Sequence, residues 1–84
     1  MSVETRTDHP HIVKVPDICG GAATVQGTRV PVWVLVEYTR AGHTPGELQD
    51  FYPHLSLAQI YDALSYWQDH PEEIEAEIRQ NQGP

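Results

Sequence analysis

The sequence is poor in cysteine, and the single Cys19 among 84 residues excludes a disulfide within the chain. It has no apolar run near the roughly 18 residues of a membrane span, and residues 1–10 hold no apolar stretch of the secretory kind. The chain is too short to divide into two domains. We therefore expect a cytoplasmic protein without membrane contact, with a flexible arm at residues 1–10, a single domain at 11–80 and a loose tail at 81–84.

Basic residues are also scarce. Five Lys and Arg stand against twelve Asp and Glu, which gives a net charge of −7. Residues 1–40 are neutral, whereas residues 41–84 hold eight acids and Arg79 as their one base. DNA affinity rests largely on Lys and Arg that replace counterions at phosphates. The composition therefore argues against strong DNA binding by an isolated monomer.

Patterns typical of catalysis or metal binding are missing as well. Of the five histidines, His9 and His11 alone lie close in sequence, and no cysteine or carboxylate is spaced around them as in zinc sites. Cys19 has no neighbouring base to activate its thiol, and the glycines beside it fit neither a P-loop nor a dinucleotide motif. We expect no enzyme activity, no catalytic residues, no cofactor and no metal.

The first third of the domain predicts β structure. Residues 11–16 are rich in β-branched side chains and run into a turn with two glycines, and residues 23–26 can supply a short partner strand. A two-stranded ribbon is marginal in water on its own, and its free edges attract further strands. This edge and the small size of the chain predict a homodimer.

Residues 31–40 are rich in valine, but their boundaries favour a helix. Pro31 suits the first helical turn, and Arg40 followed by Gly42 is typical of a helix end. In a helix, one face would carry the residues that pack inward, which are Val32, Leu35, Val36 and Thr39.

Two capping boxes predict the next two helices. Thr44 is followed three residues later by Glu47, and Ser56 by Gln59. The first of these helices is short because a proline follows it closely. The second has the strongest periodic signal of the chain, with apolar residues at Leu57, Ile60, Tyr61, Leu64 and Trp67. Pro71 begins a last, acidic helix.

A short capped helix, a turn and a longer amphipathic helix form the layout of a helix-turn-helix. The predicted fold class is mainly α, with a short N-terminal β hairpin or strand pair followed by a helix-turn-helix-like bundle of three to four helices. Many all-α bundles share this layout. The pattern alone leaves open a DNA-binding module and a plain structural bundle.

Several short elements carry a resemblance to a known family: residues 19–21 (CGG), 27–31 (GTRVP), 52–55 (YPHL) and 63–66 (ALSY). From about residue 11 to 78 the sequence resembles the small bacterial and archaeal proteins catalogued as domain of unknown function 433. The resemblance implies a helix-turn-helix domain after a short β segment, and an antitoxin-like partner of a small PIN-like nuclease. It implies no established enzyme activity.

A DNA-binding role has five candidate contact residues, which are Arg29, Arg40, His54, Ser56 and Gln59. Gln59 is of the type that reads an adenine edge. However, the predicted recognition helix has no Arg or Lys, and Asp62 on its outward face would repel phosphates.

A protein-binding role has six candidates, with Tyr66 and Trp67 as anchors and four acids, which are Glu72, Glu73, Glu75 and Glu77. The acids would complement a basic RNA-binding surface, although a solvated face and core packing of Trp67 are the alternatives. The leading hypothesis is an antitoxin-like protein that neutralises a PIN-like ribonuclease toxin and also regulates its own operon. The alternative is a helix-turn-helix regulator that binds operator DNA, or a homodimeric interaction module.

Overall fold

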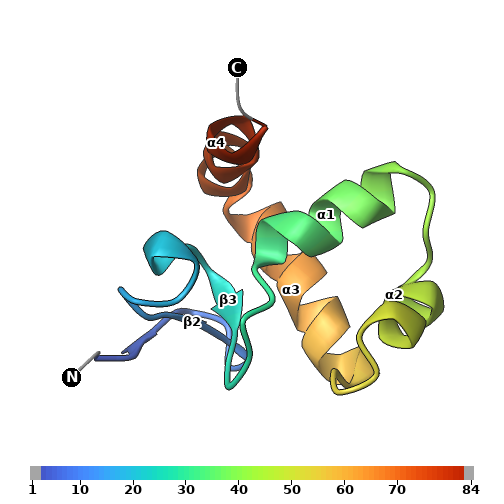
Figure 1. The fold of residues 1–84 in the computed structure, drawn as a ribbon, viewed down its shortest axis with the longest axis horizontal. Coiled ribbons are helices and arrows are strands. Elements are labelled where there is room, and N and C mark those ends of the chain that lie inside the picture. The colour runs from blue at the N-terminus through green and yellow to red at the C-terminus, as the bar shows by residue number, and fades with distance from the viewer. Residues whose placement is uncertain (1–2, 83–84) are drawn as a thin grey trace.

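The computed structural model describes residues 3–82, which form a small sheet and four helices (Figure 1). The strands are β1 (Thr5–Arg6), β2 (Ile12–Lys14) and β3 (Thr24–Val25), with a 3-10 turn, η1 (Cys19–Gly21), between the last two. The helices are α1 (Val32–Arg40), α2 (Pro45–Phe51), α3 (Leu57–Asp69) and α4 (Pro71–Asn81). The predicted fold class is confirmed. Within residues 3–82, no helix has the length and apolar content needed to cross a membrane.

The sheet has one strand more than the sequence predicted. β1 pairs antiparallel with β2, with Thr5 opposite Lys14, and β2 pairs antiparallel with β3. The expectation of a flexible arm at residues 1–10 is therefore wrong for residues 5–10, which supply β1 and a buried histidine, His9. A two-residue strand has no periodicity, so nothing local in the sequence indicates it. Residues 1–2 of the expected arm and 83–84 of the expected tail lie outside the described residues.

The third strand also changes the argument for a homodimer. β2 has a neighbour on both sides, so the isolated two-stranded hairpin does not occur. β3 in turn is tied to the start of α1, where the Val32 N–H donates to the Ala23 carbonyl oxygen at 2.9 Å. A homodimer stays a prediction.

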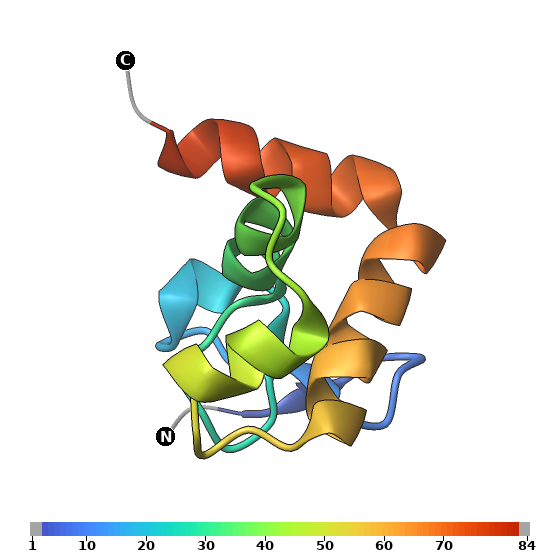
Figure 2. The same cartoon turned by 90° about the vertical axis from the view of Figure 1, so that its right-hand side faces the viewer.

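α1 lies at the centre of the helical part and packs against α2, α3 and α4 (Figure 2). Its predicted inward side chains Val32, Leu35 and Val36 are fully buried. Burial of the two valines outweighs their modest helix propensity. The helix ends as predicted, because Gly42 takes a φ of 101°, which is readily adopted by glycine alone.

Both predicted capping boxes are present. The Thr44 hydroxyl accepts from the Glu47 N–H at 3.2 Å, and the Ser56 hydroxyl accepts from the Gln59 N–H at 3.1 Å. In each box the side chain three residues on accepts from the N–H of the capping residue. The turn between α2 and α3 is anchored by Leu55, which is 1% exposed. α2, this turn and α3 thus form a helix-turn-helix unit in which both helix starts are capped.

Replacing Ser56 with alanine removes the hydroxyl that caps α3. We expect S56A to lower the free energy of unfolding by about 1 kcal/mol. Urea denaturation followed by circular dichroism measures this change. The matched control is S65A, at an exposed position in the middle of the same helix, where we expect a change below about 0.5 kcal/mol. Equal effects of the two substitutions would contradict the capping role.

Candidate functional site

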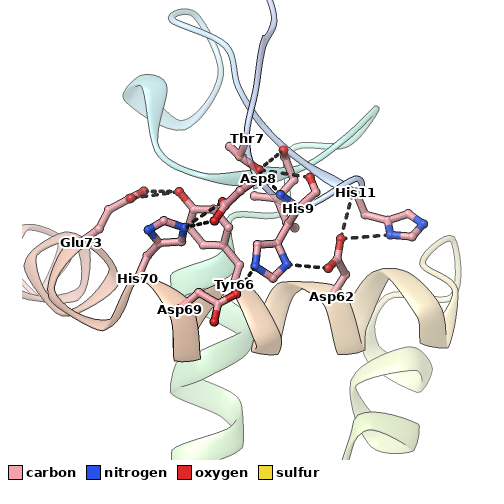
Figure 3. A network of polar contacts seen from close by, with 10 residues as sticks. Thr7, Asp8, His9, His11, Asp62, Tyr66, Asp69, His70 and Glu73 are labelled. Atoms are coloured by element: carbon pink, nitrogen blue, oxygen red, sulfur yellow. Dashed lines mark hydrogen bonds and ion pairs between the residues drawn. The ribbon is translucent and has the colours of Figure 1, made fainter.

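The N-terminal segment is fastened to α3 by a buried histidine (Figure 3). His9 is 8% exposed, its Nδ1 lies 2.7 Å from Asp62 Oδ1, and its Nε2 lies 2.6 Å from Asp69 Oδ2. Asp62 and Asp69 are about two helical turns apart, so they project from one face of α3. An imidazole that donates to a carboxylate from both nitrogens is doubly protonated. His9 is therefore held as an imidazolium between two anions.

The electrostatics agree with this assignment. Burial alone would lower the pKa of His9, but the hydrogen bonds to Asp62 and Asp69 outweigh it and raise this pKa above its usual value. Burial alone would raise the pKa of Asp62, but its hydrogen bonds from His9 and His11 keep this pKa below its usual value. Both shifts favour the charged forms of the two groups.

Asp62 also holds the backbone of the N-terminal segment. Its Oδ2 accepts from the His11 N–H at 2.9 Å and lies 3.1 Å from His11 Nδ1. Thr7 shapes the same turn, because its hydroxyl donates to the Ile12 carbonyl oxygen at 2.6 Å and accepts from the His9 N–H at 3.1 Å. The expectation that Asp62 faces outward and repels phosphate is therefore wrong, since this carboxylate is neutralised inside the molecule.

The chain carries the tripeptide Asp-His-Pro twice, at residues 8–10 and 69–71, and the structure brings the two copies together (Figure 3). Their pairing is reciprocal. His9 contacts Asp69, and His70 Nε2 lies 2.8 Å from Asp8 Oδ1. The hydrogen bond from His70 lowers the pKa of Asp8. Sequence reasoning missed this pairing, and the repeated tripeptide was the signal that could have indicated it.

Tyr66 is a core residue and not a surface anchor. Its side chain is 2% exposed, and its ring packs on His9 and His70 at centroid distances of 5.3 and 4.4 Å. Its hydroxyl donates to the Glu73 carboxylate at 2.9 Å. Burial, together with the Glu73 carboxylate, raises the pKa of Tyr66. The prediction of Tyr66 as a partner contact is therefore wrong.

The acids of α4 are mostly engaged within the molecule. Glu73 pairs with Lys14 of β2 at 3.1 Å. Glu75 pairs with Arg40 at the end of α1 and also accepts from Trp67 Nε1 at 3.3 Å. The Arg40 guanidinium lies 5.4 Å from the centroid of the half-buried Trp67 ring. Glu73 and Glu75, two predicted partner contacts, are thus paired within the molecule. Arg40, a predicted DNA contact, is paired as well, because it is the partner of Glu75.

The two remaining acids differ from each other. Glu72 is exposed in the first turn of α4. Glu77 is partly buried, and its Oε1 is buried without a hydrogen-bond partner. Burial and the nearby Glu73 carboxylate raise the pKa of Glu77. Among these acids, Glu72 is the one best exposed to a partner.

The candidate DNA contacts do not form one basic surface. His54 is exposed in the turn before α3, while Ser56 and Gln59 cap that helix by bonding each other's backbone. Arg29 is exposed just before α1, whereas Arg40 is the last residue of that helix and is paired with Glu75. The two arginines therefore stand at opposite ends of α1.

Instead, α2 and the start of α3 expose apolar side chains. Phe51, Leu57 and Tyr61 are 45%, 42% and 59% exposed. The sequence pattern assigned Leu57 and Tyr61 to the core face of α3, but the buried residues of this helix are Ile60, Ala63 and Tyr66. We call Phe51, Leu57 and Tyr61 the exposed apolar residues of the helix-turn-helix. No Lys or Arg occurs in α2, α3 or the turn between them.

The family of proteins of unknown function named DUF433 has a model that matches residues 12–67. The chain belongs to the DUF433 family. A DUF433 member from Anabaena variabilis, whose crystal structure was determined at 2.00 Å resolution, aligns with a TM-score of 0.78 and 39% identity, over 86% of this chain and 70% of that one. The resemblance found in the sequence is thus confirmed.

The uncharacterized protein y4eO of Sinorhizobium fredii is 35% identical over 60 residues, which are 71% of this chain and 27% of that protein. This chain therefore spans about a quarter of that relative. Both Asp-His-Pro tripeptides lie outside the residues that the DUF433 model matches.

Removing the Asp62 carboxylate leaves the His9 ring with one anion in place of two and the His11 N–H without its partner. We expect D62A to lower the free energy of unfolding by about 2–4 kcal/mol, because a buried cation loses one of its two anions. Urea denaturation measures the change. D50A is the control, an exposed aspartate in α2, with an expected change below about 0.5 kcal/mol. A D62A variant as stable as D50A would contradict the anchoring role.

Replacing Glu77 with glutamine should stabilise the protein in a pH-dependent way. Its pKa is raised in the fold, so the folded state loses stability as the pH rises from the usual value of 4.5 through the raised one. We expect E77Q to raise the free energy of unfolding at pH 7 by about 0.5–1 kcal/mol, because it removes a partly buried charge and, with it, the repulsion with Glu73. The gain should shrink below pH 4.5, where the carboxyl is neutral in both states.

Denaturant unfolding at a series of pH values measures this difference. E72Q is the matched control on the same helix, and it should change stability by less than about 0.5 kcal/mol at every pH. A gain for E77Q that is independent of pH would show that its cause is not the charge.

Proposed function

We propose that this DUF433 protein is an antitoxin-like binding protein that neutralises a PIN-like ribonuclease by direct contact and catalyses no reaction itself. The observation that carries this proposal is the surface of the helix-turn-helix, where Phe51, Leu57 and Tyr61 are exposed. Aromatic side chains are favoured anchors of protein interfaces. The same helices lack the Lys and Arg that phosphate contacts require.

The inhibition would act by occlusion. Tyr61, more than half exposed on α3, would insert into an apolar recess of the nuclease. The exposed carboxylate of Asp50 on α2 would face the basic groups that bind RNA. This assignment moves the partner surface from α4, whose acids Glu73 and Glu75 are paired within the molecule, to α2 and α3. The place of action would be the cytoplasm.

The alternative is a regulator that binds operator DNA, and the layout of α2, turn and α3 favours it. Its bases would have to come from residues outside these helices, such as Arg29, contributed twice by a homodimer. Binding of the protein alone to its promoter DNA, weakening steeply with salt, is the result that would favour this role. Regulation of its own operon could also arise in the complex with the nuclease.

The proposal predicts that Tyr61 contributes to nuclease binding. The nuclease encoded beside this protein would be purified, and its RNA cleavage titrated with wild type and with Y61A. We expect Y61A to weaken inhibition by about tenfold or more, the loss typical of an interface hot spot. The fold should persist because the side chain is 59% exposed, which circular dichroism checks.

The control is V3S, which removes a side chain that is 72% exposed and belongs to the N-terminal segment. It should inhibit as well as wild type does. A nuclease that neither binds the wild-type protein nor loses activity in its presence would overturn the proposed function. Equal inhibition by Y61A and wild type would overturn the assignment of the surface.

A further inference from the structure

The reciprocal Asp–His pairs gather metal-binding atoms at one point. One ligand atom each from Asp8, His9 and Asp69 lie within 4.8 Å of one another. His70 Nε2 is a further nitrogen donor, 2.8 Å from Asp8 Oδ1. The His9 side chain is 9% exposed, whereas those of Asp8 and Asp69 are each 58% exposed. The group therefore combines one buried nitrogen donor with two carboxylates at the surface.

Asp62 supplies the support that a metal-binding histidine needs. Histidine ligands almost always donate their second ring N–H to a carboxylate or carbonyl oxygen, which fixes the ring and makes the other nitrogen more basic. Here His9 Nδ1 donates to Asp62 Oδ1, and Asp62 is itself fixed by the His11 N–H. His9 Nε2 thus points toward the carboxylates of Asp69 and Asp8 (Figure 3).

The surroundings give access and negative charge. A surface pocket of about 360 Å³ opens beside Asp69 and His70 and is also lined by Pro71, Glu72 and Glu73. Three carboxylates, those of Asp8, Asp62 and Asp69, lie around the His9 ring. A divalent cation bound at His9 Nε2 would offset the negative charge of these carboxylates.

We propose that the two Asp–His pairs form a binding site for one divalent transition-metal ion of the zinc class. His9, Asp8 and Asp69 would be its ligands, a water molecule would complete a tetrahedral set, and His70 would orient Asp8 through their hydrogen bond. Zinc with bonds of about 2.0–2.1 Å requires donors about 3.3 Å apart. The 2.6 Å contact between His9 and Asp69 would therefore open by less than about 1 Å, within reach of an exposed side chain. Imidazole ligands favour zinc, nickel or copper over magnesium and calcium.

Such an ion would clamp the N-terminal segment to the junction of α3 and α4. The sequence predicted no metal because only His9 and His11 are close together along the chain. Asp69, the last residue of α3, and His70, which follows it, come near His9 only in the folded structure. The inference is independent of the proposed nuclease binding.

The test uses the full chain without a histidine tag, freed of metal with a chelator. Isothermal titration calorimetry with zinc chloride should show saturable binding of one ion per chain, and magnesium chloride should show none. Thermal unfolding should shift upward with zinc, because an ion that binds the folded state alone stabilises it. In proton NMR, zinc should move the imidazole signals of His9 and His70 and leave those of His43 and His54.

D69N removes one ligand and H70Q removes the hydrogen-bond partner of another, Asp8, and each should weaken zinc binding by about tenfold or more. Circular dichroism checks that both variants remain folded. H54Q is the matched control, an exposed histidine in the turn before α3, and it should bind as wild type does. Absence of binding at one ion per chain would overturn the proposal. So would equal affinities of D69N, H70Q and wild type, which would leave the two Asp–His pairs as ion pairs alone.

Discussion

The burial of His9 as a cation depends on the two carboxylates that meet its nitrogens. A charge inside a protein costs several kcal/mol unless it is paired and hydrogen-bonded, and Asp62 and Asp69 satisfy both conditions from one face of α3. The turn around Thr7, the pairing of β1 and the reciprocal contact of Asp8 with His70 follow from this attachment. The proposed metal site depends on it as well, because Asp62 orients the ring.

Bases from the first part of the chain pair with acids from its acidic second part within the fold. Lys14 from β2 pairs with Glu73, and Arg40 from α1 pairs with Glu75, so bases of the neutral first part meet acids of the acidic second part. Among these residues, Glu73 and Glu75 were predicted to contact a protein partner, and Arg40 was predicted to contact DNA. The net charge of −7 remains as a long-range field, but it is not concentrated in a free acidic helix.

Membership of DUF433 and the similarity to the Anabaena variabilis structure establish the fold, while the function has to be argued from the surface. The proposed protein-binding role rests on the exposure of Phe51, Leu57 and Tyr61 and on the absence of Lys and Arg from α2, α3 and the turn between them. The capping boxes serve this surface indirectly. They fix the first turns of α2 and α3 through hydrogen bonds between residues of the same helix start.

The sequence by itself determined the helices, because a cap such as Ser56 with Gln59, the valines of α1 and a breaker such as Pro71 act on their near neighbours. It also indicated β2, β3 and the family. Tertiary structure alone decided that residues 5–6 form a strand, that Tyr66 is buried and Tyr61 is exposed, and that His9 meets two aspartates. These outcomes join His9 to residues 53 and 60 positions away. Local pattern carries no information on such pairs, which arise when the N-terminal segment packs on α3.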